Sequence, residues 1–292
     1  MLTRDQKETI VETLQAYVRR FKSQKQAGNS LKGISAGTIS QMLNGKWENI
    51  SEDMWLNLQA QLGRPTGWQI CQTNAFKDVM TFLSFAKNES SVVWVTGPAG
   101  IGKSTAARIF AGDRRNVFIL PCSEDMHKAD FVKELAAKIG VDTRGLTVRE
   151  TLQSIIRQLV TLDSPLLVFD EGDKLTDSVL YYYISLYNAL EDKCGMVFLS
   201  TAYMEQRIKS GVTRRKKGYD ELESRISRKF VPLSAVNKVE VEAICRANGL
   251  ENESAIQSVQ AEAATCGNDL RRVKESVKKE LRKIAVRHQV EA

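Results

Sequence analysis

The pattern of hydrophobic and polar positions changes once along the 292 residues, near residue 70. Before this point, apolar residues recur every three or four positions, which predicts helices over residues 6–22 and 51–62. A turn-rich stretch, residues 63–71, then leads into short, continuous apolar runs that alternate with helical stretches. The chain is therefore expected to begin as a small all-α domain and to continue as an α/β domain.

Five apolar runs in the second part predict β-strands, and their continuous hydrophobicity is typical of a parallel sheet buried on both faces. These runs are residues 91–96, 116–120, 165–170, 195–201 and 229–233. Helices are predicted between them over residues 104–110, 128–139 and 147–162. The last part is helical without a strand pattern, so the expected domains are residues 1–64, 65–233 and 234–292.

Composition narrows the class of protein. Hydrophobic residues make up 42% of the chain and charged residues 26%, and no apolar run approaches the ~18 residues of a membrane-spanning helix. The first residues carry both charge signs and lack the apolar core of a secretory signal, which makes the cytoplasm the expected compartment. Five scattered cysteines and two histidines favour neither a disulfide framework nor a zinc site.

The net charge of +7 is unevenly distributed. Residues 1–68 contain 9 basic and 6 acidic side chains, residues 69–203 contain 14 and 16, and residues 204–292 contain 19 and 13. Two basic flanks around a mildly acidic centre favour a polyanionic partner such as DNA or RNA. A solvated basic face is the simpler alternative.

The sequence GPAGIGKST follows an apolar run, precedes a helical stretch and fits the P-loop pattern GxxxxGK[ST]. In such a loop, backbone N–H groups and the start of the helix hold phosphates, the lysine reaches the β- and γ-phosphates, and the hydroxyl binds Mg²⁺. The motif therefore predicts a bound nucleotide. Its predicted contact residues are Gly97, Pro98, Ala99, Gly100, Ile101, Gly102, Lys103, Ser104 and Thr105.

The apolar run 165–170 places Asp170 and Glu171 at its carboxyl end, where open α/β sheets bind their ligands. Asp170 is predicted to hold the metal through water, and Glu171 to polarise the attacking water as general base. An apolar run that ends in two acidic residues is a weak signal alone. Beside a P-loop motif it becomes a strong one.

These two motifs together resemble the AAA+ ATPases. The resemblance implies that the ligands are ATP and Mg²⁺, that a further strand lies between the P-loop strand and the Asp-Glu strand, and that a polar sensor ends the next strand. Thr201 is assigned to this sensor, with Ser200 as the alternative. The resemblance also implies a second sensor in a helical lid, where Arg271 is preferred over Arg272 in GNDLRRV.

AAA+ ATPases also carry an arginine that reaches the γ-phosphate bound by the neighbouring subunit. Arg225 and Arg228 stand where this arginine is expected, just before the fifth strand. The alternative is that both arginines are ordinary charged residues on the surface of a helix. An arginine that acts between subunits would couple ATP binding to self-assembly.

The stretch GISAGTISQMLNGKW in the first domain is similar to the second half of a helix-turn-helix. Gly33 would form the turn, with Ile34, Ile39 and Met42 buried, while Asn29 stands where the motif usually has alanine. A protein-interaction module of the same shape is the alternative. The exposed residues predicted to contact DNA are Ser35, Thr38, Ser40, Gln41 and Lys46.

Four adjacent cations, Arg214, Arg215, Lys216 and Lys217, predict an exposed loop before the expected inter-subunit arginine. Contact with DNA phosphates is one interpretation of this cluster. A solvated charge run without a ligand is equally compatible with the sequence.

Within the AAA+ ATPases, the GTIS helix, the P-loop, the DEGDK strand end and the SRI segment resemble the family of the phage Mu B transposition protein. The resemblance implies an ATP-dependent helical filament on double-stranded DNA, delivery of that DNA to a transposase, and a DNA-associated location in a bacterial host cytoplasm. That family usually has alanine where this chain has Gly172, a change expected to be tolerated.

Two other functions remain open. A helicase or replication loader would contact a helicase and prefer single strands, although no aromatic-rich stacking surface supports that preference. A transcriptional regulator would bind one specific DNA site as a dimer and use ATP only as a signal. Removal of residues 1–62 distinguishes these alternatives, because a filament former should keep ATP-dependent DNA binding.

Overall fold

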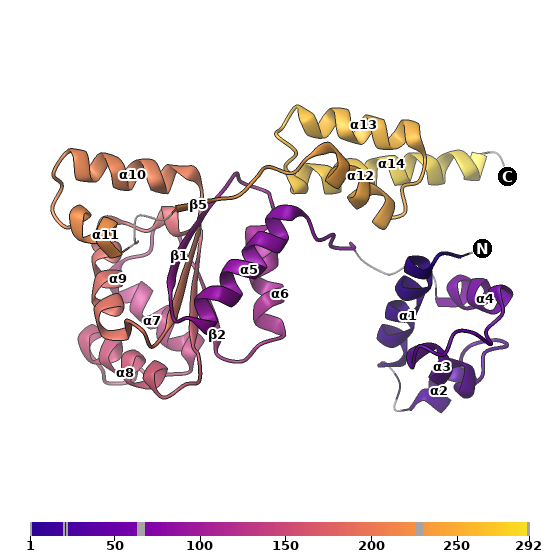
Figure 1. Cartoon of the computed structure of the whole chain (residues 1–292), viewed down its shortest axis with the longest axis horizontal. Helices are drawn as coiled ribbons and strands as arrows, with labels where there is room; N and C mark the ends of the chain where they lie inside the picture. The colour runs from indigo at the N-terminus through magenta and orange to yellow at the C-terminus, as the bar shows by residue number, and fades with distance from the viewer. Residues whose placement is uncertain (1, 20, 22, 63–67, 226–229, 291–292) are drawn as a thin grey trace. The chain divides into compact units, whose positions relative to one another are not determined.

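The computed structural model describes residues 2–19, 21, 23–62, 68–225 and 230–290. The chain forms two compact units, Met1–Ile70 and Cys71–Ala292 (Figure 1). None of the helices in the described part of the chain combines the length and the apolar character needed to span a lipid bilayer. The expected domain boundaries at residues 64 and 233 stay predictions.

Helices pack around one small core in the first unit. They are α1 (Arg4–Val18), α2 (Gln24–Asn29), α3 (Ala36–Leu43) and α4 (Glu52–Leu62). The positions predicted to be buried, Ile34, Ile39 and Met42, are at most 4% exposed, which confirms this part of the prediction. They belong to the same core as Leu14 of α1 and Trp55 of α4.

Helices α2 and α3 approach each other closely at Gly28. A β-carbon at this position would lie 3.0 Å from the backbone nitrogen of Ala36, so a larger residue would push the helices apart. The chain turns at Gly33, whose φ of +72° favours glycine. The small residue at the crossing is therefore Gly28, whereas Asn29 beside it is exposed.

The second unit is built on a parallel sheet whose described strands follow the order β2-β3-β4-β1-β5. The strands are β1 (Val92–Thr96), β2 (Val117–Pro121), β3 (Leu166–Asp170), β4 (Gly195–Ser200) and β5 (Phe230–Pro232). All five strand predictions are confirmed to within about one residue at most ends. Because β4 lies between β1 and β3, the carboxyl ends of these three strands meet at one edge.

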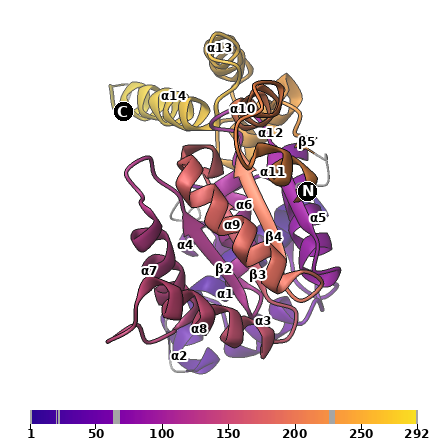
Figure 2. The ribbon, with the colours of Figure 1, turned by 90° about the vertical axis from the view of Figure 1, so that its left-hand side faces the viewer.

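Helices cover both faces of the sheet. They are α5 (Asn74–Asn88), α6 (Lys103–Gly112), α7 (Lys128–Ile139), α8 (Val148–Val160), α9 (Asp177–Leu190), α10 (Ala202–Thr213) and α11 (Tyr219–Arg225), with a 3₁₀ turn, η1 (Gly172–Lys174). Figure 2 shows α7, α8 and α9 in front of the sheet and α5 and α6 behind it. Helices α6, α7 and α8 confirm the three helix predictions in this region.

Local sequence signals set the ends of these helices. Thr147 Oγ1 accepts a hydrogen bond from the N–H of Glu150, and the Glu150 carboxylate accepts one from the N–H of Thr147 at 2.8 Å. This capping box satisfies backbone donors at the start of α8. Helix α7 ends at Gly140, whose φ of +87° is the left-handed conformation that commonly stops a helix.

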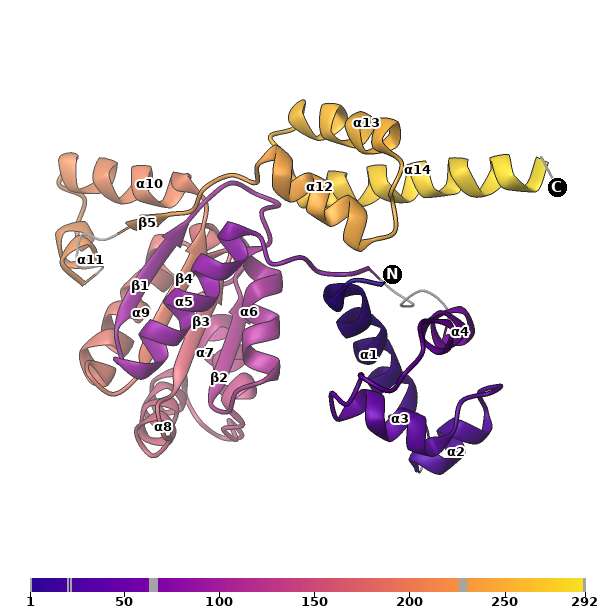
Figure 3. The ribbon, with the colours of Figure 1, turned by 45° about the vertical axis from the view of Figure 1, so that its right-hand side comes forward.

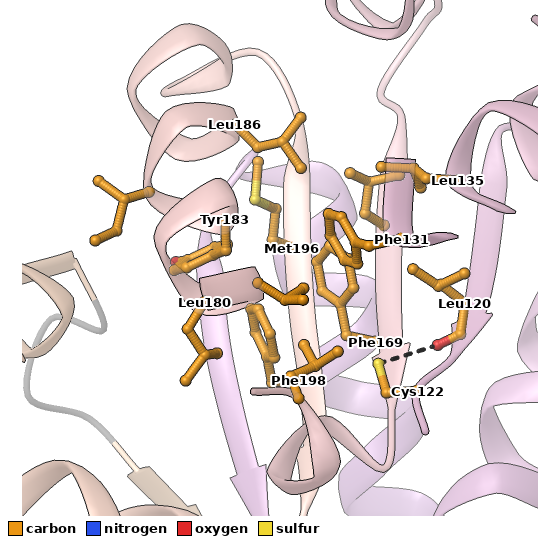
Figure 4. Close-up of a cluster of buried hydrophobic side chains, with 14 of the residues drawn as sticks. Leu120, Cys122, Phe131, Leu135, Phe169, Leu180, Tyr183, Leu186, Met196 and Phe198 are labelled. Carbon is orange, nitrogen blue, oxygen red and sulfur yellow. Dashed lines mark hydrogen bonds between the residues drawn. The ribbon is translucent and has the colours of Figure 1, made fainter. Parts of the chain in front are cut away.

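An aromatic core fills the space between the sheet and α9 (Figure 4). Phe198 of β4 lies between Trp94 and Phe169, with ring centroids 3.9 and 4.5 Å apart, and Tyr183 of α9 meets it edge-on. A β-carbon on Gly172 would lie 2.9 Å from Phe198. The large ring at position 198 therefore accounts for glycine in η1, because packed cores have little room for an added methyl group.

After β5 the chain forms only helices among its described residues, as the sequence pattern predicts (Figure 3). These are α12 (Lys238–Ala247), α13 (Glu253–Ala264) and α14 (Leu270–Val290). The Glu240 carboxylate of α12 accepts hydrogen bonds from the N–H groups of Asn237 and Asn74, at 2.8 and 2.6 Å. One acidic side chain thus caps α12 and also joins it to the start of α5. Helices α12, α13 and α14 together are called the helical lid below.

Candidate nucleotide-binding site

The P-loop joins β1 to α6 and has a backbone that requires its glycines. Gly100 and Gly102 have φ values of +75° and +96°, which residues with a β-carbon seldom adopt. Lys103 opens α6, and its ammonium group donates to the carbonyls of Gly97 at 2.7 Å and Pro98 at 2.9 Å. The lysine charge therefore lies against the loop that is predicted to bind the phosphates of the nucleotide.

The surroundings of Lys103 act on its charge in opposite directions. Burial lowers the pKa of the Lys103 ammonium group, while the charges of Asp173, Asp170 and Glu171 raise it. Burial is the larger effect, so the pKa lies below its ordinary value. Phosphates beside the ammonium group would favour its charged form.

Ser104 and Asp170 meet where α6 begins and β3 ends. Ser104 Oγ donates a hydrogen bond to Asp170 Oδ1 at 2.9 Å. Burial raises the pKa of the Asp170 carboxyl, and the Ser104 hydrogen bond offsets part of this shift. A hydroxyl and a carboxylate oxygen side by side suit Mg²⁺, which prefers hard oxygen ligands, so these two residues fit the predicted metal.

Glu171 follows Asp170 at the exposed rim of the same edge. Its φ of +59° lies in the left-handed region, and its carboxylate pairs with the ammonium group of Lys174. The side chain is 47% exposed. Water therefore reaches this carboxylate, as the predicted role of general base requires.

Ser200, the last residue of β4, and Thr201, which follows it, contact the site in different ways. Thr201 Oγ1 donates to Asp173 Oδ2 at 2.7 Å, in the turn that follows Glu171. The carbonyl of Ser200 accepts a hydrogen bond from the N–H of Gly97 at 3.1 Å, while its side chain is buried. Of the two predicted sensors, Thr201 is the one whose hydroxyl contacts η1, the turn that follows Glu171.

The helical lid reaches the P-loop at Gly100. The N–H of Leu270 donates to the Gly100 carbonyl at 2.9 Å, and a β-carbon on Gly100 would lie 2.2 Å from the Asp269 carboxylate. Asp269 Oδ1 also accepts from the N–H of Arg271 at 2.8 Å. The Arg271 charge contributes to the lowered pKa of Lys103, which places this arginine in the electrostatic environment of the loop.

Residues 87–208 match a family described as "AAA domain". The matched stretch contains the P-loop, β3 with Asp170, and β4. Residues 87–208 therefore form an AAA domain. The parallel sheet and the position of the P-loop after β1 agree with that assignment.

Relatives with similarity beyond the AAA+ domain are known. The Mu-like prophage FluMu DNA transposition protein B of Haemophilus influenzae is 24% identical over 82% of this chain and 85% of its own length. The ATP-dependent target DNA activator B proteins of Escherichia phages D108 and Mu are each 25% identical over 78% of this chain and 74% of their own length. These matches confirm the resemblance to B transposition proteins.

Arg225, the last residue of α11, contacts other residues of the same chain. Its Nε donates to Asn188 Oδ1 at 2.9 Å, its Nη2 pairs with Glu221 at 2.9 Å, and its guanidinium lies 5.8 Å from the ring centroid of Tyr187. Arg228 lies outside the described residues. A role for either arginine between subunits stays a prediction.

The DNA-contact residues predicted in the first unit lie on α3 or beside it. Ser35 caps α3 through a hydrogen bond from the N–H of Thr38 at 3.0 Å, and Ser40 Oγ accepts one from the Asn44 side chain at 3.2 Å. Gln41 and Lys46 are exposed. The hydroxyls that were expected to contact DNA therefore also stabilise the ends of their own helix.

The basic segment, residues 214–217, joins α10 to α11, and all four of its residues are exposed. The Lys216 ammonium group nevertheless pairs with Asp177, and the Tyr181 hydroxyl donates to the carbonyl of Lys217. Sequence analysis did not identify Asp177. It has no local signal in the sequence, because its partners lie 30 or more residues away in the chain.

Proposed function

We propose that this protein is an ATP-dependent, largely sequence-nonspecific DNA-binding ATPase that assembles on target DNA and delivers it to a transposase during DNA transposition. The observation that carries the proposal is the contact between Ser104 of the P-loop and Asp170. It occurs in a chain similar to proteins named ATP-dependent target DNA activators. The basic flanks of the chain support DNA as the partner.

ATP hydrolysis is assigned to the carboxyl edge of the sheet. Backbone N–H groups of the P-loop, from all its residues except Pro98, would hold the phosphates. Lys103 Nζ would exchange its two carbonyl partners for phosphate oxygens. Ser104 and Asp170 would hold Mg²⁺, which when bound offsets the negative charge of the phosphates. Glu171 would accept a proton from the attacking water.

Three further groups would contact or sense the γ-phosphate of the bound ATP. Thr201 would act from the end of β4, Arg271 from the lid, and Arg225 or Arg228 from a neighbouring subunit. Such an arginine is worth roughly 10³ to 10⁵ in rate, so a site that needs one hydrolyses ATP efficiently only in an assembly. For Arg225, this role would require its contact with Asn188 to open.

DNA binding is assigned to phosphate contacts more than to base contacts. The cations of the basic segment would supply electrostatic affinity that does not depend on sequence, and the exposed face of α3 would add polar contacts. ATP-bound subunits would assemble along the duplex as a helical filament. Hydrolysis would then release them and so time the exposure of the target DNA.

The test is binding to long random-sequence duplex DNA with ATP, with ADP and without nucleotide, over a series of salt concentrations, with affinity and complex size as readouts. We expect large complexes that require ATP and weaken steeply with salt. Lys103→Ala should abolish the dependence on ATP. Lys133→Ala, an exposed lysine on α7, serves as the matched control.

Two other results would contradict the proposal. Small complexes at one specific site, indifferent to nucleotide, would favour a transcriptional regulator. A strong preference for single strands, together with binding to a helicase, would favour a loader. A variant that lacks residues 1–62 adds a second criterion, because the proposed protein keeps ATP-dependent DNA binding through its AAA+ domain.

A further inference from the structure

The basic segment belongs to a polar network in which Asp177, the first residue of α9, is central. Asp177 Oδ1 accepts hydrogen bonds from the Arg207 guanidinium and, at 2.7 Å, from the Tyr219 hydroxyl. Its Oδ2 pairs with the Lys216 ammonium group. One carboxylate is thus shared among α10, α11 and the segment between them, helices that lie together beside the sheet in Figures 1 and 3.

The other end of this network lies at the nucleotide site. Arg207 Nη1 donates to the carbonyls of Leu175 at 2.7 Å and Asp173 at 3.3 Å. The Asp173 carboxylate in turn accepts the hydrogen bond from Thr201. Polar contacts therefore run without interruption from the end of β4, through the turn after Glu171, to the basic segment.

Packing fixes the backbone of this corner. A β-carbon on Gly211 would lie 1.9 Å from the Tyr219 ring, and one on Gly218 would lie 2.5 Å from the Tyr181 ring. Gly218 also has a φ of +81°, which favours glycine. The basic segment is therefore held in one place, while its cationic side chains face solvent.

The groups around Asp177 differ in exposure, so that a ligand in solvent can reach one end of the network more easily than the other. The Lys216 side chain is 55% exposed, whereas those of Asp177 and Arg207 are 26% and 16% exposed. A DNA phosphate can reach the Lys216 ammonium group and compete for it with Asp177. The carboxylate would then depend on Arg207 and Tyr219 alone, because a partly buried charge is costly without its partners.

The carboxylate is ionised under ordinary conditions. Burial raises the pKa of Asp177, but the hydrogen bonds from Lys216, Tyr219 and Arg207, with the Arg207 charge, hold it at about 2. A change in the partners of Lys216 is therefore a change in the charge balance around Arg207. Arg207 binds the backbone of Asp173 and Leu175, in and just after η1, directly.

We propose that Asp177 is a positioning residue that couples phosphate contact at the basic segment to the nucleotide state of the AAA+ site. The inference rests on the proposed function, because it takes DNA as the phosphate ligand and ATP as the nucleotide. Linkage requires the coupling to be reciprocal: ATP strengthens DNA binding by the factor by which DNA strengthens ATP binding.

The experiment measures the Kd of the full-length protein for random-sequence duplex with and without ATP, and takes the ratio of the two values. Asp177→Asn keeps the shape and removes the charge. We expect it to reduce the ratio by about tenfold, within the usual range of coupling between sites, while ATP affinity without DNA changes by no more than about twofold. Asp142→Asn is the matched control, since Asp142 is an exposed carboxylate paired with Arg144.

A second pair of variants keeps the test decisive if Asp177→Asn unfolds, which thermal melting would show. Lys216→Gln changes an exposed side chain that belongs to the network and should also reduce the ratio. Lys217→Gln changes its neighbour, whose carbonyl contacts Tyr181. It should weaken DNA binding equally with and without ATP.

The outcomes separate the two proposals. If the DNA affinity of the wild-type protein is the same with and without ATP, the proposed function itself is contradicted. Wild-type protein that responds to ATP, with Lys216→Gln and a folded Asp177→Asn that respond equally well, overturns only the coupling through Asp177.

Discussion

The two regions predicted to contact DNA differ in chemistry and in attachment. Helix α3 presents short neutral side chains, and its buried residues Ile39 and Met42 pack into the core of the first unit. The basic segment presents cations and is bound through Asp177 to Arg207, which contacts the turn η1. Under the proposed coupling, only the basic segment would make a DNA contact that responds to nucleotide.

The largest expected effect comes from Lys103→Ala. Removing a cation that would contact the β- and γ-phosphates should lower ATP affinity about 100-fold, which corresponds to about 2.7 kcal/mol. DNA binding should then lose the part that depends on ATP and keep the part that needs no nucleotide. Titration with a fluorescent ATP analogue and DNA binding measure the two effects. ATP-dependent DNA binding by this variant at wild-type strength would contradict the assignment.

The next prediction compares the two regions directly. The triple variant with alanine at Arg214, Arg215 and Lys217 should reduce the slope of log affinity against log salt by about 2.7, because each phosphate contact contributes ~0.9. The double variant with alanine at Ser40 and Gln41 removes neutral groups, so its slope should equal that of the wild type. DNA affinity measured from low to high salt distinguishes the two.

A matched triple variant controls for net charge. Lys133, Lys138 and Arg149 are exposed cations on α7 and α8, and their replacement by alanine makes the same change in charge. Its salt dependence should stay close to that of the wild type. If it fell as far as that of the segment variant, general electrostatic attraction would explain the result and no local contact would be needed.

These contrasts also show what the sequence could predict. The strands and the P-loop are local: continuous apolar runs gave β1 to β5, and GxxxxGK[ST] located Lys103 at the start of α6. Helix α9, DSVLYYYISLYNAL, has apolar residues on most of its sides, so it shows no clear stripe of helical period and was not predicted.

The roles of Asp177 and Asp269 had no local signal. Asp177 meets Arg207 and Lys216 across 30 or more residues, and Asp269 packs on Gly100 across a still longer stretch of chain. Only the fold brings these groups together. The sequence therefore located the groups predicted to perform the chemistry, whereas the long-range contacts around them emerged from the structure.

A stability prediction tests the rigidity of the corner that holds the basic segment. Gly211→Ala would force the Tyr219 ring away from α10, so we expect the free energy of unfolding to fall by about 1–3 kcal/mol. Chemical denaturation measures this loss. Gly112→Ala is the control, because a β-carbon at that position of α6 meets no atom within 4 Å, and it should be neutral or stabilising. Equal stability of the two variants would mean that the corner adapts easily.

The smallest expected effect is a dependence of stability on pH that belongs to Asp177. Its pKa is about 2 in the folded protein and about 3.9 in an unfolded chain. The lower folded value means that ionised Asp177 stabilises the fold above about pH 4, and that this contribution is lost as the pH falls toward 2. Urea denaturation of wild type and Asp177→Asn from pH 7 to pH 3 should therefore show a stability difference that shrinks on acidification, by no more than about 2 kcal/mol. Parallel curves would mean that the ion pairs with Arg207 and Lys216 do not depend on the carboxylate charge, and the network would then lose the electrostatic basis on which its coupling rests.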